Sequence, residues 1–311
     1  MKKQTITSSL LLLLAAIIWG AAFVAQSVGM EYMEPLTFNA ARFLVGGFVL
    51  LPFALLDEVK QWKAIPTEKG RKSQLKTTLI GGLCCGIAIC TASTFQQYGM
   101  LYTSVGKAGF ITALYIVLVP IAGLFFKRKA RRLVWLSVAI AVIGLYLLCI
   151  NESLTVNFGD LLMFCCAIVF TSHILVIDHF SPKAKGVTLS CIQFLFSGVV
   201  SMVGMFLLEK PTWNGIIMGA LPILYAGVMS CGIAYTLQIL GQKHVEPAIA
   251  SLILSLESVV SVLAGWVLLH EILNKREIIG CVLMFVAVVL VQLPERKKVT
   301  YENNLDYSRE N

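Results

Sequence analysis

Two charged side chains, Glu257 and Arg42, lie deep inside long apolar stretches of the sequence. In a bilayer, a charge at the centre costs at least about 2.5 kcal/mol on insertion scales, so such a residue faces a protein interior and marks a functional site. Glu257 could exchange a proton, bind a cation or contact an amine, or it could form a structural hydrogen bond between helices. Arg42 could bind a carboxylate, of a ligand or of Glu257, or its long stem could carry the guanidinium to the membrane surface.

Neutral polar and aromatic side chains stand in the same apolar surroundings. His173 could shuttle a proton, because an imidazole exchanges protons near neutral pH, or it could be a neutral, hydrogen-bonded residue of the core. Four glutamines could line a polar cavity or join helices by hydrogen bonds worth about 0.6 kcal/mol each. These glutamines are Gln96, Gln97, Gln193 and Gln238. The rings that could form cavity walls, or pack in the core, are Trp19, Phe95, Tyr115 and Tyr235.

The composition limits the elements that can position these side chains. The chain has 311 residues, of which 58% are hydrophobic and 14% charged, and its mean hydropathy is +0.82. Soluble globular proteins carry about 25% charged residues, so this chain lacks the polar side chains to cover a surface that faces water. The composition excludes disorder and indicates a protein solvated by lipid.

Ten stretches of the sequence are almost free of charge. Most have the roughly 20 residues that an α-helix needs to cross about 30 Å of hydrocarbon. None alternates with the period of a β-strand, so helices are the form expected in lipid. We therefore predict an all-α membrane protein with ten transmembrane helices. The stretches are Leu10–Val28, Leu36–Leu56, Thr77–Met100, Ala108–Phe126, Leu133–Ile150, Leu161–Ile177, Val187–Leu208, Gly215–Leu240, Ala248–Leu269 and Ile278–Leu293.

The loop charges predict the direction of these helices. The net charge is +8, and most of the 25 lysines and arginines lie in loops on the side of the N-terminus. Since basic loops stay in the cytoplasm, we predict a multi-pass protein of the plasma membrane with both termini cytoplasmic. The basic excess then reflects topology, so the lipid bilayer is an expected partner and nucleic acid is not.

The sequence contains an internal repeat. A shift of 151 residues aligns spans 1 and 2 with spans 6 and 7, and pairs Gly47 with Gly198. A shift of 142 residues aligns spans 3 and 4 with spans 8 and 9, and pairs Gln96 with Gln238. The difference between the two shifts falls in a long basic loop, Asp57–Lys76, that the second half lacks. Repeats of this kind indicate duplicated structural units.

The odd number of spans in each half decides how the halves are related. With five crossings each, the second half must enter the membrane upside down relative to the first. We predict two inverted repeats, residues 8–150 and 158–293, and a cytoplasmic tail, residues 294–311. Inverted repeats are typical of transporters that bind substrate between the repeats near mid-membrane and expose it to each side in turn.

Motifs for other kinds of chemistry are missing. The sequence has no H-E-x-x-H, G-x-S-x-G, EF-hand or Rossmann pattern, and its nine cysteines form no C-x-x-C. We expect no catalytic residues, no metal site, no cofactor and hence no enzyme. Two G-x-x-x-G pairs are compatible with close helix packing or with a homodimer. They are Gly82 with Gly86 and Gly215 with Gly219.

Three segments resemble a known family. The segment Ala250–Glu271 resembles the ninth span of the EamA-type drug/metabolite transporters. The segments Ala108–Pro120 and Trp19–Phe23 are similar to further parts of that family. With ten spans in two halves, the resemblance covers about residues 8–293.

The resemblance implies a function and two site residues. It implies a proton- or gradient-driven carrier, commonly an exporter of amino acids or related metabolites. By position it extends to Glu257 and to Glu271, for which we expect a structural role. Ser258 replaces the usual proline, which puts the expected helix bend in doubt, and Lys127–Lys129 stand where the first half often has an acid.

The sequence thus predicts a secondary transporter that exports small metabolites such as amino acids by alternating access. Its partners would be the small-molecule substrate and a proton, with Glu257 for coupling and Arg42 or His173 as its partner. An alternative is a flippase or exporter of lipid-linked or drug-like amphiphiles, which requires a cavity open sideways to lipid. A more distant alternative is an intramembrane lipid enzyme that uses His173 and Glu257 as acid and base.

Overall fold

The computed structural model describes residues 2–64, 67–103, 105–127, 130–150, 156–269 and 274–293. These residues form helices joined by short turns and contain no β-strand. The helices are α1 (Lys2–Gly29), α2 (Pro35–Ala64), α3 (Glu68–Gly99), α4 (Val105–Ala113), α5 (Tyr115–Phe125), α6 (Arg132–Cys149), α7 (Phe158–Phe180), α8 (Gly186–Leu208), α9 (Trp213–Met218), α10 (Ala220–Leu224), the π-helix η1 (Tyr225–Ala234), α11 (Tyr235–Gln242), α12 (Pro247–Leu254), α13 (Glu257–Leu269) and α14 (Lys275–Gln292).

The helices confirm the predicted all-α membrane protein. Eight helical segments in the described part of the chain are long and apolar enough to cross a bilayer, and Arg132–Leu148 is a shorter apolar helix. Helix α14 has 18 residues and carries Lys275, Arg276 and Glu277 in its first turn. A span count of ten, with these last two helices as crossings, stays a prediction.

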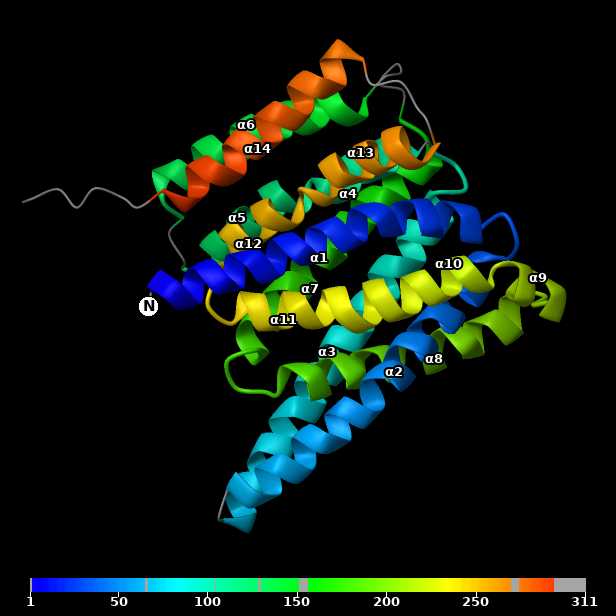
Figure 1. Ribbon diagram of the computed structural model, residues 1–311, viewed down its shortest axis with the longest axis vertical. Coiled ribbons are helices and arrows are strands. Elements are labelled where there is room, and N and C mark those ends of the chain that lie inside the picture. Colours follow the sequence, from blue (N-terminus) through cyan, green and yellow to red (C-terminus); the bar gives the residue numbers. More distant parts are fainter. Residues whose placement is uncertain are drawn as a thin grey trace, which may run out of the picture.

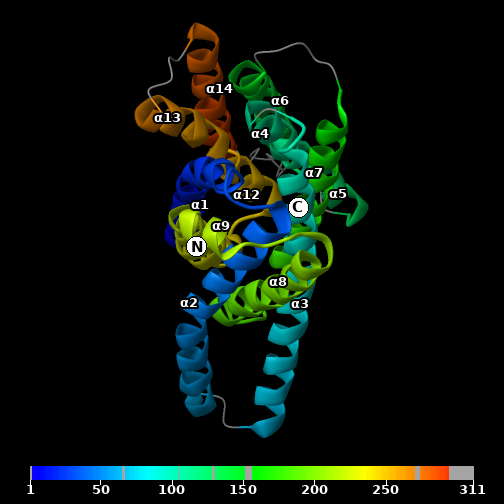
Figure 2. The same ribbon diagram turned by 90° about the vertical axis from the view of Figure 1, so that its right-hand side faces the viewer.

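The region expected as a long basic loop, Asp57–Lys76, is mostly helical. Helix α2 continues to Ala64 and α3 begins at Glu68. Both ends are rich in Lys, Glu, Gln and Ala, which favour helices, so their charge does not end the helix. The two ends project beyond the other helices in both views (Figures 1 and 2).

The two halves pack against each other through equivalent helices. Helix α2 packs along α8, α3 along α7, and α6 along α14, while α1 contacts η1, α11 and α13. The α6–α14 pair lies at one edge of the molecule, and α1, α7, η1 and α11 lie nearer its middle (Figure 1). The largest buried apolar cluster joins α1, α5, α6, α12 and α14, and so combines side chains from both halves.

One crossing shows the symmetry of the repeat at atomic scale. A Cβ atom on Gly47 would lie 2.7 Å from Leu195 Cδ2, and one on Gly198 would lie 2.8 Å from Leu44 Cδ2. Gly47 and Gly198 are equivalent in the repeat, as are Leu44 and Leu195. Each glycine therefore makes room for the leucine of the opposite half, and α2 and α8 approach closely.

The ends of the α2–α8 pair are fixed by equivalent glutamates. At one end the Glu209 carboxylate accepts hydrogen bonds from the backbone N–H groups of Leu36 and Thr37, both at 2.7 Å. An anion there satisfies the free N–H groups of the α2 N-terminus. At the other end Glu58, 151 residues earlier, pairs with Lys185 Nζ at 2.8 Å. Helices α2 and α8 are thus joined at both ends.

Two spans are broken at equivalent positions near the middle of the molecule. Leu114 N donates to Ile111 O at 3.2 Å between α4 and α5, and Leu256 N donates to Ile253 O at 3.2 Å between α12 and α13. These are tight turns that interrupt the α-helical pattern. The break in the ninth span forms although Ser258 replaces proline, so the doubt that the sequence raised about this bend was unfounded.

Both G-x-x-x-G pairs are used inside the chain. Gly82 and Gly86 lie against side chains of α8, and Gly215 and Gly219 lie against Tyr32 and Met33. These contacts correspond to the close-packing interpretation of the motif. A homodimer would therefore use another face of the molecule.

Candidate functional site

A small cavity lies where the two halves meet. Its volume is about 50 Å³, which is space for only about four water molecules at 10–15 Å³ each. An amino acid would not fit in this space without movement of the walls. The lining residues are Trp19, Phe23, Gln26, Arg42, Gln96, Thr112, Tyr115, Phe170, His173, Ile174, Ser230, Tyr235, Gln238, Leu254 and Glu257.

The structure brings together most of the site residues predicted from the sequence. Gln193 lies behind the lining, where its Oε1 atom is 3.2 Å from His173 Nε2. Gln97 is fully buried and does not line the cavity, and neither does Phe95. The predicted residues that do line it are Trp19, Arg42, Gln96, Tyr115, His173, Tyr235, Gln238 and Glu257.

The cavity lies on the axis that relates the repeats. Five pairs of its lining residues are equivalent under the shifts of 151 and 142 residues, whereas Arg42 and His173 have counterparts, Gln193 and Ala22, that do not line it. The walls are therefore nearly symmetric and the charges are not. The equivalent pairs are Trp19 with Phe170, Phe23 with Ile174, Gln96 with Gln238, Thr112 with Leu254, and Tyr115 with Glu257.

Glu257 lies at the break in the ninth span and is buried. It begins α13, where the helix dipole favours a negative charge. Tyr115 begins α5 at the equivalent break, and its hydroxyl donates to Glu257 Oε1 at 3.1 Å. Two equivalent residues thus meet across the axis as a phenol and a carboxylate.

Arg42 is only 4% exposed and is held by neutral groups. Its Nη1 atom donates to Gln26 Oε1 at 2.8 Å, and its Nε atom donates to Asn39 Oδ1 at 3.0 Å. Its guanidinium carbon lies 4.9 Å from the centre of the Phe43 ring. The alternative that Arg42 reaches the membrane surface is wrong, because the side chain turns into the cavity; no ion pair with Glu257 forms within the described residues.

Comparisons with known proteins agree on one family. Residues 6–150 and 157–293 each match the EamA-like transporter family. The chain belongs to this family. An uncharacterized transporter of Archaeoglobus fulgidus is 31% identical over 284 residues, covering 91% of this chain and 84% of the relative. The uncharacterized inner membrane transporter YedA of Escherichia coli is 28% identical over 282 residues, covering 89% and 88%.

A solved crystal structure supports the same fold. It has a TM-score of 0.75 to this structure and 17% sequence identity, and the alignment covers 92% of this chain and 96% of the other. At this identity the likeness concerns the fold alone. The family and its relatives establish a multi-pass membrane transporter. What the cavity of this EamA-like chain can bind has to be inferred from its own residues.

Several polar atoms on the cavity wall of this EamA-like transporter have no hydrogen-bond partner among the described residues. Buried polar atoms are nearly always paired, and an unpaired one costs about 1–3 kcal/mol. A polar ligand or water in the cavity would satisfy them. They are Trp19 Nε1, Thr112 Oγ1, His173 Nδ1 and Gln238 Oε1.

Aromatic rings form the apolar part of the wall. The Trp19 and Tyr235 rings lie 4.5 Å apart, and the His173 ring packs edge-on against Tyr235 with centroids at 5.8 Å. The cavity therefore combines two buried charges, several amides and an aromatic surface, which suits a small ligand with both polar and apolar parts. The described residues contain no group of three His, Cys, Asp or Glu that could hold a metal ion.

The sequence missed Gln26 and Asn39, which hold Arg42, and the lining residues Thr112 and Ser230. Short hydroxyl side chains are common in transmembrane helices, so Thr112 and Ser230 gave no signal. Gln26 carried a usable one, since an amide this far into an apolar stretch needs a partner.

Proposed function

We propose that this EamA-like transporter is a secondary carrier that exports small zwitterionic metabolites such as amino acids by alternating access. One observation carries the proposal. Arg42 and Glu257 line the same cavity, and each is held by neutral side chains and not by the other. A zwitterion supplies the two missing opposite charges within one molecule.

Each charge suits one end of the cargo. A guanidinium binds a carboxylate with two parallel hydrogen bonds, the strongest type of charge-assisted pair. The Glu257 carboxylate would accept from the ammonium group, and the rings of Trp19 and Tyr235 would pack against its side chain. Because burying a charge is costly unless it is paired, the cargo stabilises the cavity that receives it.

Glu257 also offers a way to couple export to a proton. A carboxylate that has taken up a proton no longer attracts an ammonium group, so proton and cargo compete for the same oxygen atoms. A proton that reaches Glu257 from outside would release the cargo there, and cargo that binds from the cytoplasm would displace the proton inward. The carrier would thus exchange a proton for each cargo molecule.

The proposed setting is the plasma membrane, with both termini in the cytoplasm. The basic loops on the side of the N-terminus support this orientation through the positive-inside rule. The proposed partners are the cargo, the proton and the surrounding lipid.

Transport by purified protein in liposomes tests the coupling. Glu257→Gln should reduce the accumulation of a labelled amino acid driven by a pH gradient by about tenfold or more, because the amide neither exchanges a proton nor attracts the ammonium group; a tenfold loss corresponds to about 1.4 kcal/mol. Glu31→Gln removes an exposed carboxylate outside the cavity and serves as the matched control. If Glu257→Gln matches wild type at every pH, Glu257 has no coupling role.

One observation favours the alternative cargo, an amphiphile. A groove of about 970 Å³ lies between α5 and α7, lined mainly by apolar side chains such as Leu118, Phe125 and Leu175. Such a groove could admit an amphiphile from the side. Movement of a fluorescent lipid analogue without amino acid transport would support this alternative, and amino acid transport by the purified protein would argue against it.

His173 and Glu257 line one cavity, so an acid–base pair is geometrically open to them. The family consists of transporters, which points away from an enzyme. Product formation from a lipid in sealed vesicles without any gradient would revive the enzymatic alternative.

A further inference from the structure

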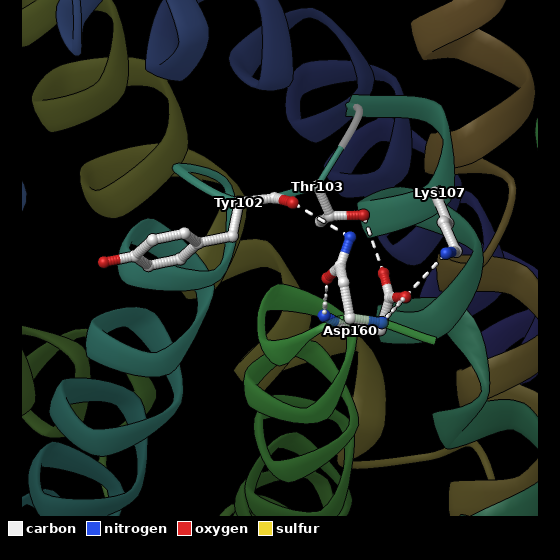
Figure 3. Close-up of polar contacts among 5 residues, drawn as sticks. Tyr102, Thr103, Lys107 and Asp160 are labelled. Carbon is white, nitrogen blue, oxygen red and sulfur yellow. Dashed lines mark hydrogen bonds and ion pairs between the residues drawn. The ribbon is translucent and has the colours of Figure 1, made fainter. Parts of the chain in front are cut away.

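A second polar cluster joins Lys107 on α4 to Asp160 on α7 (Figure 3). Lys107 Nζ lies 2.6 Å from Asp160 Oδ2, and the two side chains are only 13% and 5% exposed. Thr103 Oγ1 donates to the other Asp160 oxygen at 2.7 Å, and Asn157 Nδ2 donates to Tyr102 O at 3.0 Å. The cluster joins the turn before α4, in the first half, to the start of α7, in the second half.

The ion pair bridges two helical segments that form the cavity wall. Lys107 precedes Thr112 by five residues on α4, and Asp160 precedes Phe170 by ten residues on α7. At 1.5 Å per residue the pair lies about 7–15 Å further toward the outer face than these lining residues. Helices α4 and α7 cannot separate at this end while the pair is intact.

At the inner end, the two positions equivalent to Lys107 and Asp160 form no ion pair. Under the repeat, Lys107 corresponds to Ile249 on α12, and Asp160 corresponds to Ser9 on α1. Neither residue carries a charge. The two ends of the carrier therefore have the same arrangement of helices, but only the outer end has an ion pair at these positions.

We propose that Lys107 and Asp160 are positioning residues that hold the external gate closed and separate when cargo leaves. This inference rests on the proposed function for its direction, because the outer face is the face of release. Separating the pair gives up its charge-assisted hydrogen bond, so the intact pair favours the closed outer gate.

Hydrogen exchange of the purified protein in lipid nanodiscs, without cargo, tests this gate. Lys107→Gln is the sharper variant, because Asp160 also accepts from the backbone N–H of Asn157 in the cap of α7. The rate of amide hydrogen exchange should rise at least about fivefold in the outer ends of α4 and α7 and fall in the inner ends of α1 and α12. A fivefold change corresponds to a coupling free energy between the two ends of about 1 kcal/mol.

Two variants separate gating from loss of stability. Lys107→Arg keeps the ion pair and should retain the wild-type pattern. Lys185→Gln breaks the matched pair with Glu58 at the inner end of α2 and α8 and should leave the outer ends of α4 and α7 unchanged. If Lys107→Gln changes neither end, or loosens both ends alike, the gate assignment is wrong.

This experiment also separates the gate from the proposed cargo. The exchange pattern is measured without substrate, so it does not depend on which metabolite is carried. If the exchange pattern changes as expected but the protein transports no amino acid, the gate assignment stands and the proposed cargo is wrong. If the protein transports amino acids but the exchange pattern does not change, the proposed cargo stands and the gate assignment is wrong.

Discussion

Arg42 is the buried cation with which the carboxylate of the proposed cargo would pair. Gln26 and Asn39 orient the guanidinium through amide oxygens and leave its charge uncompensated. Removing one partner of a buried charge pair typically costs 2 kcal/mol or more. Arg42→Gln should therefore raise the KM for a zwitterionic cargo by about 30-fold or more. Exchange kinetics in liposomes measure this, with Arg132→Gln, outside the cavity, as control; an unchanged KM would remove Arg42 from the site.

The glutamines show how far the position of a single side chain can be predicted from the sequence. Gln96 and Gln97 look alike in the sequence, but neighbours on an α-helix point about 100° apart, so only Gln96 faces the cavity. The repeat identified Gln96 and Gln238 together because both halves keep the amide. It gave no help with Gln26, whose counterpart Ile177 is apolar. Which side chains contact a buried charge depends on how the helices pack in three dimensions. Residue spacing in the sequence alone does not reveal this.

At the scale of the helix, the break before Glu257 depends on backbone turns and not on proline. Ser258 N donates only a turn-type bond to Ser255 O, at 3.2 Å, and lies in the first turn of α13. Ser258→Pro should therefore change the free energy of unfolding by less than about 1 kcal/mol, whereas Val262→Pro, inside α13, should cost about 3 kcal/mol or more. Unfolding in detergent measures both; equal losses would show that α13 is continuous with α12 in the membrane.

The helices themselves were largely predictable. Their breaks were not predictable from residue types, and only the family resemblance implied a bend in the ninth span. Long apolar stretches specify membrane helices because lipid leaves the backbone no other partner. The turns at Leu114 and Leu256 carry no glycine or proline at the break, so no residue type announces them. The extension of α2 and α3 was missed because their charged residues suggested a loop. Charged residues end a membrane span, but they do not end a helix.

For the whole molecule, the inverted repeat makes a prediction about sidedness. With five crossings in each half, the chain would cross the membrane ten times and so end on the side on which it began. Green fluorescent protein fused before Met1 or after Asn311 should fluoresce from the cytoplasm, and alkaline phosphatase inserted at Lys210 should be active outside. Termini found on opposite faces would contradict the ten-span topology and with it the inverted arrangement.

The fold of the whole molecule followed from the repeat more than from any single motif. Equivalent residues identified two halves, and the structure packs them through equivalent helices, as Gly47 and Gly198 show. The sequence did not reveal that the walls of the cavity are symmetric while its charges are not. That difference depends on which residues of each pair diverged after duplication.

The contact between Tyr115 and Glu257 has a consequence for ancestry. These residues are counterparts, so in an ancestor made of two identical separate subunits the same amino acid would face itself across the axis. Two glutamates there would repel each other, and two tyrosines would offer no negative charge. When both copies lie in one chain, one position can carry an acid while its counterpart carries the hydroxyl that hydrogen-bonds to it, as Glu257 and Tyr115 do.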